Sequence, residues 1–241
     1  KVTPAEGSSF VNEDLNASGV TLTASAADGT IDTSALDAQL IAGNSYVIEE
    51  VTPPAGYEKI TGTLTFAVDA DGKISAVANV TNDSAFAIDT ANDVMTITAT
   101  DNPVEVTLNK VGTNSAKLDA TFTLKGTFAS ENMDGTVEAA ESTRTIDVHD
   151  GTVTLDRLVV GNTYVLQETT SQAGYEVITG TFTFTVNENG TITPAAEGND
   201  TAYAVTGDNI AIMATNTPVQ ITVTKVDEQG DNLPGAEFTL T

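Results

Sequence analysis

Three residue types recur in register along the 241-residue chain, and together they can do chemistry. Each set consists of a lysine, a glutamate shortly after a Tyr-Val pair, and an acid or amide two residues before a proline. The sets are Lys110, Glu168 and Asn216, and Lys1, Glu50 and Asp101. Burial in an apolar core lowers the pKa of a lysine amine and raises the pKa of a carboxyl group. A buried set of this kind therefore combines a nucleophilic amine, a carboxyl group that polarises a carbonyl and moves a proton, and a carbonyl carbon to attack.

The sets recur because the sequence itself repeats. Residues 46–66 match residues 164–184, and residues 99–111 match residues 214–226, with matched residues 118 or 115 positions apart. This period is the size of a whole domain rather than of a solenoid repeat. The expected units are a sandwich with a truncated first strand at 1–103, a complete sandwich at 104–218 and the first strands of a third at 219–241.

The alignment makes Lys1, Lys110 and Lys225 equivalent residues. An apolar strand is expected after each of them, at residues 19–24, 120–126 and 236–241. Lys225 lacks a glutamate and an acceptor within the chain, so we expect it to be unbonded. Because proline has no N–H for a strand to use, Pro103 and Pro218 are expected to mark the seams between units. The linkers are then very short, and neighbouring units should be held stiffly end to end.

Period-two alternation predicts an all-β protein. Residues 61–68 and 179–186 alternate apolar residues with threonine, which is typical of strands with one buried face. Asp-Gly and Asn-Gly turns follow them at 69–73 and 187–191. Further strands are expected at 94–100, 104–110 and 210–215. Short strands separated by turns indicate tandem Ig-like β-sandwiches joined end to end.

Composition excludes several classes of function. The chain has 34 acidic and 9 basic residues, and a formal net charge of −25 argues against nucleic-acid or anionic-membrane binding. With no cysteine there are no disulfides, thiolate metal sites or cysteine nucleophiles. No apolar run approaches the roughly 20 residues of a membrane span, so we expect no membrane insertion. No cofactor, phosphate loop or metal cluster is expected, and any targeting signal should lie outside these residues.

The sequence resembles the collagen-adhesin B-type (CnaB) domains of Gram-positive surface adhesins and sortase-assembled pili. The motifs that carry the resemblance are V-T-L-N-K-V at 106–111, Y-V-L-Q-E-T at 164–169 ahead of A-G-Y-E, and A-T-N-T-P at 214–218. It covers essentially the whole chain, as two units and a fragment, and implies a prealbumin-like fold. It also implies a spontaneous intramolecular isopeptide bond between the lysine and the Asn or Asp, which the glutamate assists.

In the second unit this implies a bond between Lys110 and Asn216 with loss of ammonia, assisted by Glu168. A buried Lys–Glu ion pair beside a polar Asn, with no bond formed, is the alternative. Either arrangement needs all three side chains inside the sandwich.

In the first unit the resemblance implies a bond between Lys1 and Asp101 with loss of water. Asn102 is a neighbouring alternative acceptor. Alternation favours Glu50 over Glu49 as the inward glutamate, because a slip of one residue reverses the face.

The function implied is structural. We expect rigid stalk or shaft modules of an extracellular, cell-wall-anchored adhesin or pilus, and no turnover enzyme. The partners would be neighbouring repeats, and host extracellular matrix through a tip outside this chain. The alternative is a ligand-binding adhesive domain for a host matrix protein or glycan. It needs a long loop or groove in one unit only, at 126–148 or 76–93. Residues 25–40 and 126–148 are irregular, and we expect a short helical turn or long loops there.

Two other motifs favour plain structural interpretations. Asp69–Gly72 resembles part of a calcium loop, but the remaining acidic positions are absent, so a hairpin turn is expected. His149 beside Asp150, with Ser142 nearby, suggests a hydrolase site, but no nucleophile elbow accompanies them. We expect His149 to be a solvated loop residue.

Overall fold

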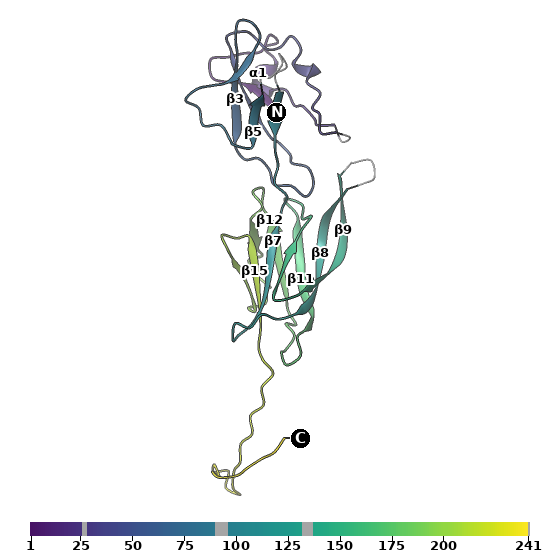
Figure 1. Cartoon of the computed structure of the whole chain (residues 1–241), viewed down its shortest axis with the longest axis vertical. Coiled ribbons are helices and arrows are strands. Elements are labelled where there is room, and N and C mark those ends of the chain that lie inside the picture. The colour runs from purple at the N-terminus through teal and green to yellow at the C-terminus, as the bar shows by residue number, and fades with distance from the viewer. Residues whose placement is uncertain (26–27, 90–95, 132–136, 241) are drawn as a thin grey trace.

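The computed structural model describes all residues except 26–27, 90–95, 132–136 and 241. Two β-rich bodies follow one another along the long axis of the molecule, and the C-terminal residues leave the second body as an extended trace (Figure 1). We call residues 1–103 the first unit, residues 104–218 the second unit and residues 219–241 the tail.

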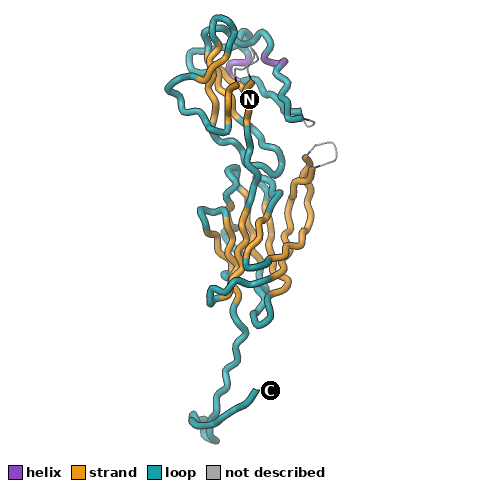
Figure 2. Tube along the Cα trace, viewed as in Figure 1, coloured by secondary structure: helices purple, strands orange, loops and turns teal. Residues whose placement is uncertain are grey.

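Strands make up nearly all of the regular structure (Figure 2). The exceptions within the described residues are the one-turn helix α1 (Leu15–Ser18) and the 3₁₀ turn η1 (Ser34–Leu36). The predicted all-β class is therefore confirmed, as is the short helical turn expected within 25–40. In the part of the chain that the structure describes, no helix has the length and apolar content needed to cross a bilayer.

The second unit is a sandwich of two sheets with strand orders β10-β7-β15-β14 and β13-β12-β11-β8-β9. The strands are β7 (Val106–Gly112), β8 (Ala120–Glu131), β9 (Val137–Val148), β10 (Thr152–Leu155), β11 (Thr163–Ser171), β12 (Thr181–Val186), β13 (Ile192–Pro194), β14 (Tyr203–Thr206) and β15 (Ala211–Asn216). β7 and β15 pair in parallel, whereas the other neighbours pair antiparallel. The first and last strands of the unit therefore lie side by side.

Alternation along the strands builds the core of the second unit. In β12 the residues Phe182, Phe184 and Val186 are buried, and the threonines between them are half-buried. Phe184 stacks on Tyr164, and Phe182 stacks on Tyr203, each pair with ring centroids 5.5 Å apart. Offset stacking at this distance is favourable beyond the apolar area that it buries. The two sheets are thus joined by an aromatic layer next to the candidate site.

The expectation of loops at residues 126–148 is wrong. β8 and β9 form a hairpin whose register runs without a slip from Ala120↔Val148 to Glu131↔Val137. Most of β9 is exposed, so its outer half shows no alternation of apolar and polar residues that could have signalled a strand. Continuous pairing with β8 stabilises it instead.

The first unit repeats only part of this plan. Its sheets are β1-β2-β3-β4 and the two-stranded β5-β6. The strands are β1 (Val2–Pro4), β2 (Ser45–Glu49), β3 (Thr63–Val68), β4 (Ile74–Ala76), β5 (Phe86–Asp89) and β6 (Thr96–Ala99). Phe10, Tyr46 and Phe66 form its aromatic core, with centroid distances of 5.3 and 5.7 Å.

The equivalence of Lys1 and Lys110 is wrong. Val2 pairs with Ile48 of β2, just as Leu124 of β8 pairs with Leu166 of β11. β1 therefore occupies the position of β8, on the sheet opposite the one that contains β7. A two-residue Lys-Val match could not fix the register, whereas burial of Val2 against the core does.

The strand expected at 19–24 is also wrong, because these residues make only isolated bridges, among them Val20 with Val2. The position of β7 is consequently not filled by any described residue of the first unit. Residues that correspond to β10 form the turn η1, and β5 is the only strand that pairs with β6 among the residues that the structure describes.

The tail contains no strand among its described residues, so the strand expected at 236–241 is wrong as far as residue 240. Val226 and Asn232 make an isolated bridge. Apolar side chains along the tail are exposed, with Ile221 at 78% and Leu240 at 92%. A strand in water needs partners for its backbone groups, and the tail has no sheet beside it.

The seams repeat the same contacts. Tyr57 bridges Pro103 as Tyr175 bridges Pro218. The first unit also contacts the second directly, because the Lys59 N–H donates to the Glu188 carbonyl oxygen at 2.8 Å. The two side chains of this pair form an ion pair at 3.1 Å. These contacts support the expected close end-to-end junction.

Candidate functional site

Three elements of the second unit bring Lys110, Glu168 and Asn216 together. Lys110 lies on β7 opposite Ala214 of β15, and Asn216 ends β15. Glu168 lies on β11 in the facing sheet, beside a bulge that separates it from Thr170 in the register with β8. Alternation makes Leu166 and Glu168 inward, while Gln167 between them is exposed. The site is therefore in the middle of the sandwich.

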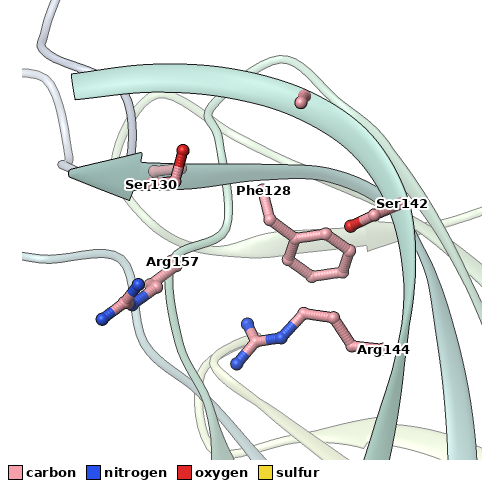
Figure 3. Close-up of a pocket in the computed structure, with 7 residues that line it drawn as sticks. Phe128, Ser130, Ser142, Arg144 and Arg157 are labelled. Carbon is pink, nitrogen blue, oxygen red and sulfur yellow. The ribbon is translucent and has the colours of Figure 1, made fainter. Parts of the chain in front are cut away.

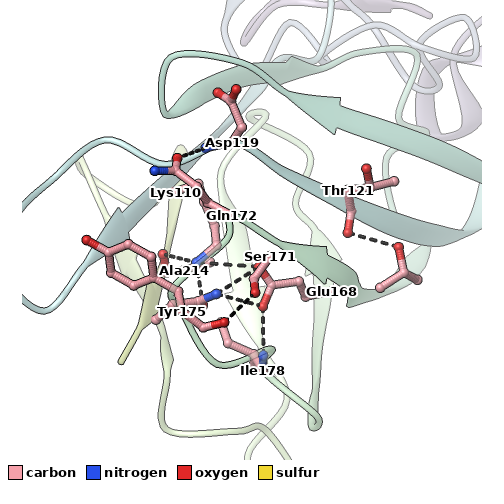
Figure 4. A network of polar contacts seen from close by, with 11 residues as sticks. Lys110, Asp119, Thr121, Glu168, Ser171, Gln172, Tyr175, Ile178 and Ala214 are labelled. Carbon is pink, nitrogen blue, oxygen red and sulfur yellow. Dashed lines mark hydrogen bonds and ion pairs between the residues drawn. The ribbon is translucent and has the colours of Figure 1, made fainter. Parts of the chain in front are cut away.

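The three side chains contact one another directly, and Figure 4 shows Lys110 and Glu168 among their neighbours. The Lys110 Nζ donates to Asn216 Oδ1 and lies 3.4 Å from the Ala214 carbonyl oxygen. It lies 3.6 Å from Glu168 Oε1. Asn216 Nδ2 donates to both Glu168 oxygens at 3.1 Å, and the Ile178 N–H donates to Glu168 Oε2 at 2.7 Å. The glutamate thus faces both the lysine nitrogen and the amide nitrogen.

This arrangement refines the role expected for the carboxyl group. Glu168 faces Nδ2 of the amide, while the carbonyl oxygen faces Lys110. The carboxylate is therefore placed to take a proton from one nitrogen and give it to the other.

Burial sets the electrostatics of this site. Lys110 is 0% exposed, Asn216 1% and Glu168 2%. Loss of hydration lowers the pKa of Lys110, and the neighbouring Glu168 opposes that shift. The dry surroundings favour the neutral amine, which is the nucleophilic form.

The structure brings Glu50 and Asp101 together but not Lys1. Glu50 Oε2 accepts from the Ile60 N–H at 2.7 Å, which reproduces the contact of Glu168 with Ile178. Burial, together with the charge and hydrogen bonding of Glu50, raises the pKa of Asp101 to about 6. This carboxyl–carboxyl contact is the counterpart of the Glu168–Asn216 contact.

Lys1 is on the other sheet. Its Nζ lies 3.8 Å from Glu49 Oε1, and its side chain is 29% exposed. Among the contacts of the described residues, none joins Lys1 to Asp101. The physical reason is the position of β1 beside β2, away from β6.

The long hairpin of the second unit forms a hollow within 126–148, one of the two regions named above for a groove. Phe128, Arg144 and Arg157 line it, with a volume of about 210 Å³ (Figure 3). The Arg144 guanidinium lies 4.9 Å from the Phe128 ring centroid and pairs with Asp156 at 3.0 Å. Ligand pockets are commonly 300–1,000 Å³, so this hollow is small. The other region proposed for a groove, 76–93, lies partly outside the described residues.

The remaining motifs lie in turns. Asp69 Oδ1 accepts from the N–H groups of Asp71 and Lys73, and the Asp69 N–H donates to the Lys73 carbonyl oxygen. This is the predicted hairpin turn between β3 and β4, and its carboxylate caps the turn itself. His149 is exposed in the tight turn between β9 and β10, where its carbonyl oxygen accepts from the Thr152 N–H. Lys225 is exposed in the tail.

Fold and site together define a tandem prealbumin-like β-sandwich protein with a buried Lys–Glu–Asn set in its complete unit. The profile of the SpaA prealbumin-like fold domain matches residues 3–84 and 104–200. The chain belongs to this family, which confirms the resemblance seen in the sequence.

Solved structures with partial similarity come from pili. The C-terminal fragment of the pilus adhesin SpaC from Lactobacillus rhamnosus GG is 23% identical, covering 77% of this chain and 80% of that chain, with a TM-score of 0.39. In a longer SpaC structure the match is 23% identical, with a TM-score of 0.38, and covers 75% of this chain but 25% of the adhesin. The major pilin T-13 of Streptococcus pyogenes is 19% identical over 73% of this chain and 66% of that chain, with a TM-score of 0.29. None of the curated proteins matches the chain.

Proposed function

We propose that this chain supplies stiff, covalently cross-linked stalk modules of an extracellular bacterial adhesin or pilus. The proposed units are 1–103, 104–218 and the opening of a third at 219–241. Membership of the SpaA prealbumin-like family and the close junction between units support a structural role. The observation that carries the proposal is the buried contact of Lys110, Glu168 and Asn216.

The proposed reaction joins Lys110 to Asn216 once per molecule. The neutral Nζ attacks Cγ of Asn216, and a C–N bond forms. Glu168 takes a proton from Nζ and delivers it to Nδ2, the Cγ–Nδ2 bond breaks, and ammonia leaves. Fixing amine and amide in contact gives an effective molarity on the order of 10⁵ M or more, which allows a slow amide exchange to proceed without an enzyme.

The cross-link would matter because of where the two strands lie. β7 opens the second unit and β15 closes it, and the two are parallel neighbours. A tensile force that enters at β7 could pass through the new bond into β15 without unfolding residues 111–215. Closing a loop of this length stabilises the folded unit by about 4–5 kcal/mol, by analogy with disulfides.

The noncovalent alternative is a buried ion pair beside an amide. It predicts the same positions for the three side chains but the full mass of the chain. Intact-mass measurement separates the two, because the bond removes the mass of one ammonia.

The test uses two variants beside the native chain. Lys110→Arg keeps the charge but removes the nucleophile, so the full mass should return. Glu168→Gln keeps both reacting groups but removes the proton carrier, so the full mass should also be found or be lost only slowly. Native protein with its full mass would refute the bond. A Glu168→Gln chain that cross-links as fast as the native chain would refute the role of the glutamate.

A further inference from the structure

Both arginines of the chain line one hollow. The chain has 34 acidic residues and two arginines, Arg144 and Arg157, and both lie at the hollow beside Phe128. Arg144 comes from β9, and Arg157 from the segment that follows β10. In Figure 3 the guanidinium of Arg144 lies along the Phe128 ring, on the side where Arg157 lies. Positive charge is therefore concentrated at this point of the second unit.

Hydrogen-bond donors remain available on both guanidinium groups. Arg144 Nη1 donates to the Asp156 carbonyl oxygen and Nη2 to Asp156 Oδ1, each at 3.0 Å. These contacts fix the plane of the group and leave other donors unused, since a guanidinium has five N–H groups. Arg157 is exposed, and among the described residues no hydrogen bond or ion pair engages its guanidinium. One arginine is thus held in place, and the other can move toward a ligand.

The aromatic ring and one backbone contact of this region recur in the first unit. Phe10 is the counterpart of Phe128, 118 residues earlier in the chain. The Ala129 N–H donates to the Arg157 carbonyl oxygen at 2.9 Å. In the first unit the N–H of the residue after Phe10 donates to the Gln39 carbonyl oxygen at 3.0 Å. Gln39 therefore takes the place of Arg157.

Arg144 also has an uncharged counterpart. Arg144 pairs with Leu124 of β8, and in the first unit Val20 makes the matching bridge to Val2. The first unit thus forms the same local structure with valine and glutamine at these two positions. This part of the fold does not depend on the arginines, so both are available for binding.

An open strand edge lies next to the hollow. β9 is at the edge of its sheet, and among the described residues it pairs with β8 alone. Ala140, Ser142 and Arg144 alternate along β9, share one of its faces and line the hollow. Backbone groups on the outer edge of β9 can pair with another extended segment. Side chains of that segment on the same face would then lie beside the hollow.

We propose that the hollow and the outer edge of β9 bind an extended acidic peptide of another protein. The peptide would add to β9 as a strand, and the side chain of one aspartate or glutamate would enter the hollow. Its carboxylate would accept hydrogen bonds from Arg144 and Arg157, because planar guanidinium groups match the geometry of a carboxylate. The hydroxyl groups of Ser130 and Ser142 at the same hollow add further donors.

Size and charge favour such a peptide over other ligands. The hollow has a volume of about 210 Å³, so it admits one side chain rather than a drug-sized ligand. The rest of the ligand must lie outside it, where the edge of β9 offers backbone partners. A net charge of −25 repels acidic ligands at long range, so binding depends on short-range contacts at the hollow. The second unit would then bind a partner in addition to its proposed structural role.

The test is fluorescence anisotropy of labelled peptides with the complete chain at about 0.15 M salt, where the Debye length is about 8 Å. The probes have about eight residues, within the usual length of a strand, and alternate threonine with either glutamate or glutamine. The glutamate peptide should bind at least about tenfold more tightly than the glutamine peptide. Equal affinities, or no binding of the glutamate peptide, would overturn the proposal. Heparin that binds to a chain without affinity for the glutamate peptide would assign the hollow to an anionic glycan instead.

Two matched variants locate the binding site. Arg157→Gln introduces the residue of the first unit and should weaken binding of the glutamate peptide by about tenfold or more, with the unfolding temperature unchanged. Lys125→Gln removes the same charge from the other face of β8, where the lysine side chain is 62% exposed, and should leave the affinity unchanged. Equal affinity of the Arg157→Gln chain and the native chain would refute the hollow as the site.

Methylation of the peptide backbone tests the strand addition. One glutamate peptide carries an N-methyl group on every glutamate, and a second carries one on every threonine. Alternate N–H groups point to opposite edges of a strand, so one of the two peptides should lose about tenfold or more in affinity. Binding of both peptides as tightly as the parent would contradict pairing with β9. None of these measurements involves Lys110, Glu168 or Asn216, so a negative result would leave the proposed function intact.

Discussion

The last strands of the two units, β15 and β6, are closely related in sequence but lie in different environments. β15 of the second unit has a partner on each edge, and its Ala214 and Asn216 are buried. In the described part of the first unit β6 has one partner, and its Ala99 is exposed while Asp101, just beyond it, is half-buried. The sequence around the acceptor, Asn216 or Asp101, therefore does not by itself exclude water from it. In the second unit the neighbouring strand β7 excludes the water, and β7 also carries Lys110.

The largest expected difference between the units is the effect of removing their lysines. Lys110→Met should lower the free energy of unfolding of the second unit by about 4–5 kcal/mol, because the proposed cross-link to Asn216 could not form. Lys1→Met should cost less than about 1 kcal/mol, because its ion pair is partly exposed. Pulse proteolysis in urea, with fragments assigned by mass, measures both. Equal losses in the two units would contradict the difference.

A smaller difference is expected at the matched alanines. Ala214→Leu should destabilise the second unit by about 1–3 kcal/mol, because a larger side chain has no space in a packed core. Ala99→Leu should change stability by no more than about 0.5 kcal/mol, because Ala99 is exposed. The same proteolysis assay applies. A large cost at Ala99 would mean that the edge of β6 is covered.

The hydrogen bonds of one tyrosine hydroxyl should stabilise both units equally. The Tyr164 hydroxyl donates to the Thr127 carbonyl oxygen and accepts from the Val159 N–H, and the Tyr46 hydroxyl does the same with Ser9 and Ile41. Each Tyr→Phe change should cost about 1–2 kcal/mol.

Equal losses of unfolding free energy, measured by urea titration of each variant, would show that the hydroxyl contacts of Tyr46 and Tyr164 are equivalent. A loss confined to Tyr164→Phe would mean that the first unit is not ordered around Tyr46. The comparison thus tests the core that both units share, apart from the strand position that only β7 of the second unit fills among the described residues.

The first unit should also have a pH dependence of its own. Asp101 has a pKa of about 6 in the folded chain and an ordinary value of 3.8, so the folded state binds its proton more tightly. Stability from this group is present below about pH 4 and is lost as the pH rises to about 6. Carboxyl carbon NMR should show Asp101 titrating near pH 6, and Asp101→Asn should flatten this part of the stability profile. Titration near 3.8 would refute the carboxyl–carboxyl contact.

Much of the second unit could be predicted because local and repeated signals agree there. Alternation in 179–186 and the Asn-Gly turn after it specify a strand and a hairpin. The matched positions of Glu50 and Glu168 identified inward glutamates, since each accepts a backbone N–H ten residues later in the chain.

The wrong predictions concern segments whose local sequence pattern is compatible with more than one strand partner. Val2 could pair in the position of β7 or of β8, and only burial against Ile48 decides it. The outer half of the β8–β9 hairpin has little apolar alternation, so its strands follow from pairing with each other. The tail has the alternation of a strand but no sheet beside it.

The sequence by itself determined the strand-rich class, the repeat, the turns and the residue types that can react, because these depend on backbone propensity and period. Only the tertiary structure decided which lysine lies beside which acceptor. Strand order is set by long-range pairing and by the burial of one face, and neither is encoded in the spacing of Lys, Glu and Asn. Lys110 meets Asn216 because β7 lies between β10 and β15, whereas Lys1 lies beside Glu49 because β1 pairs with β2.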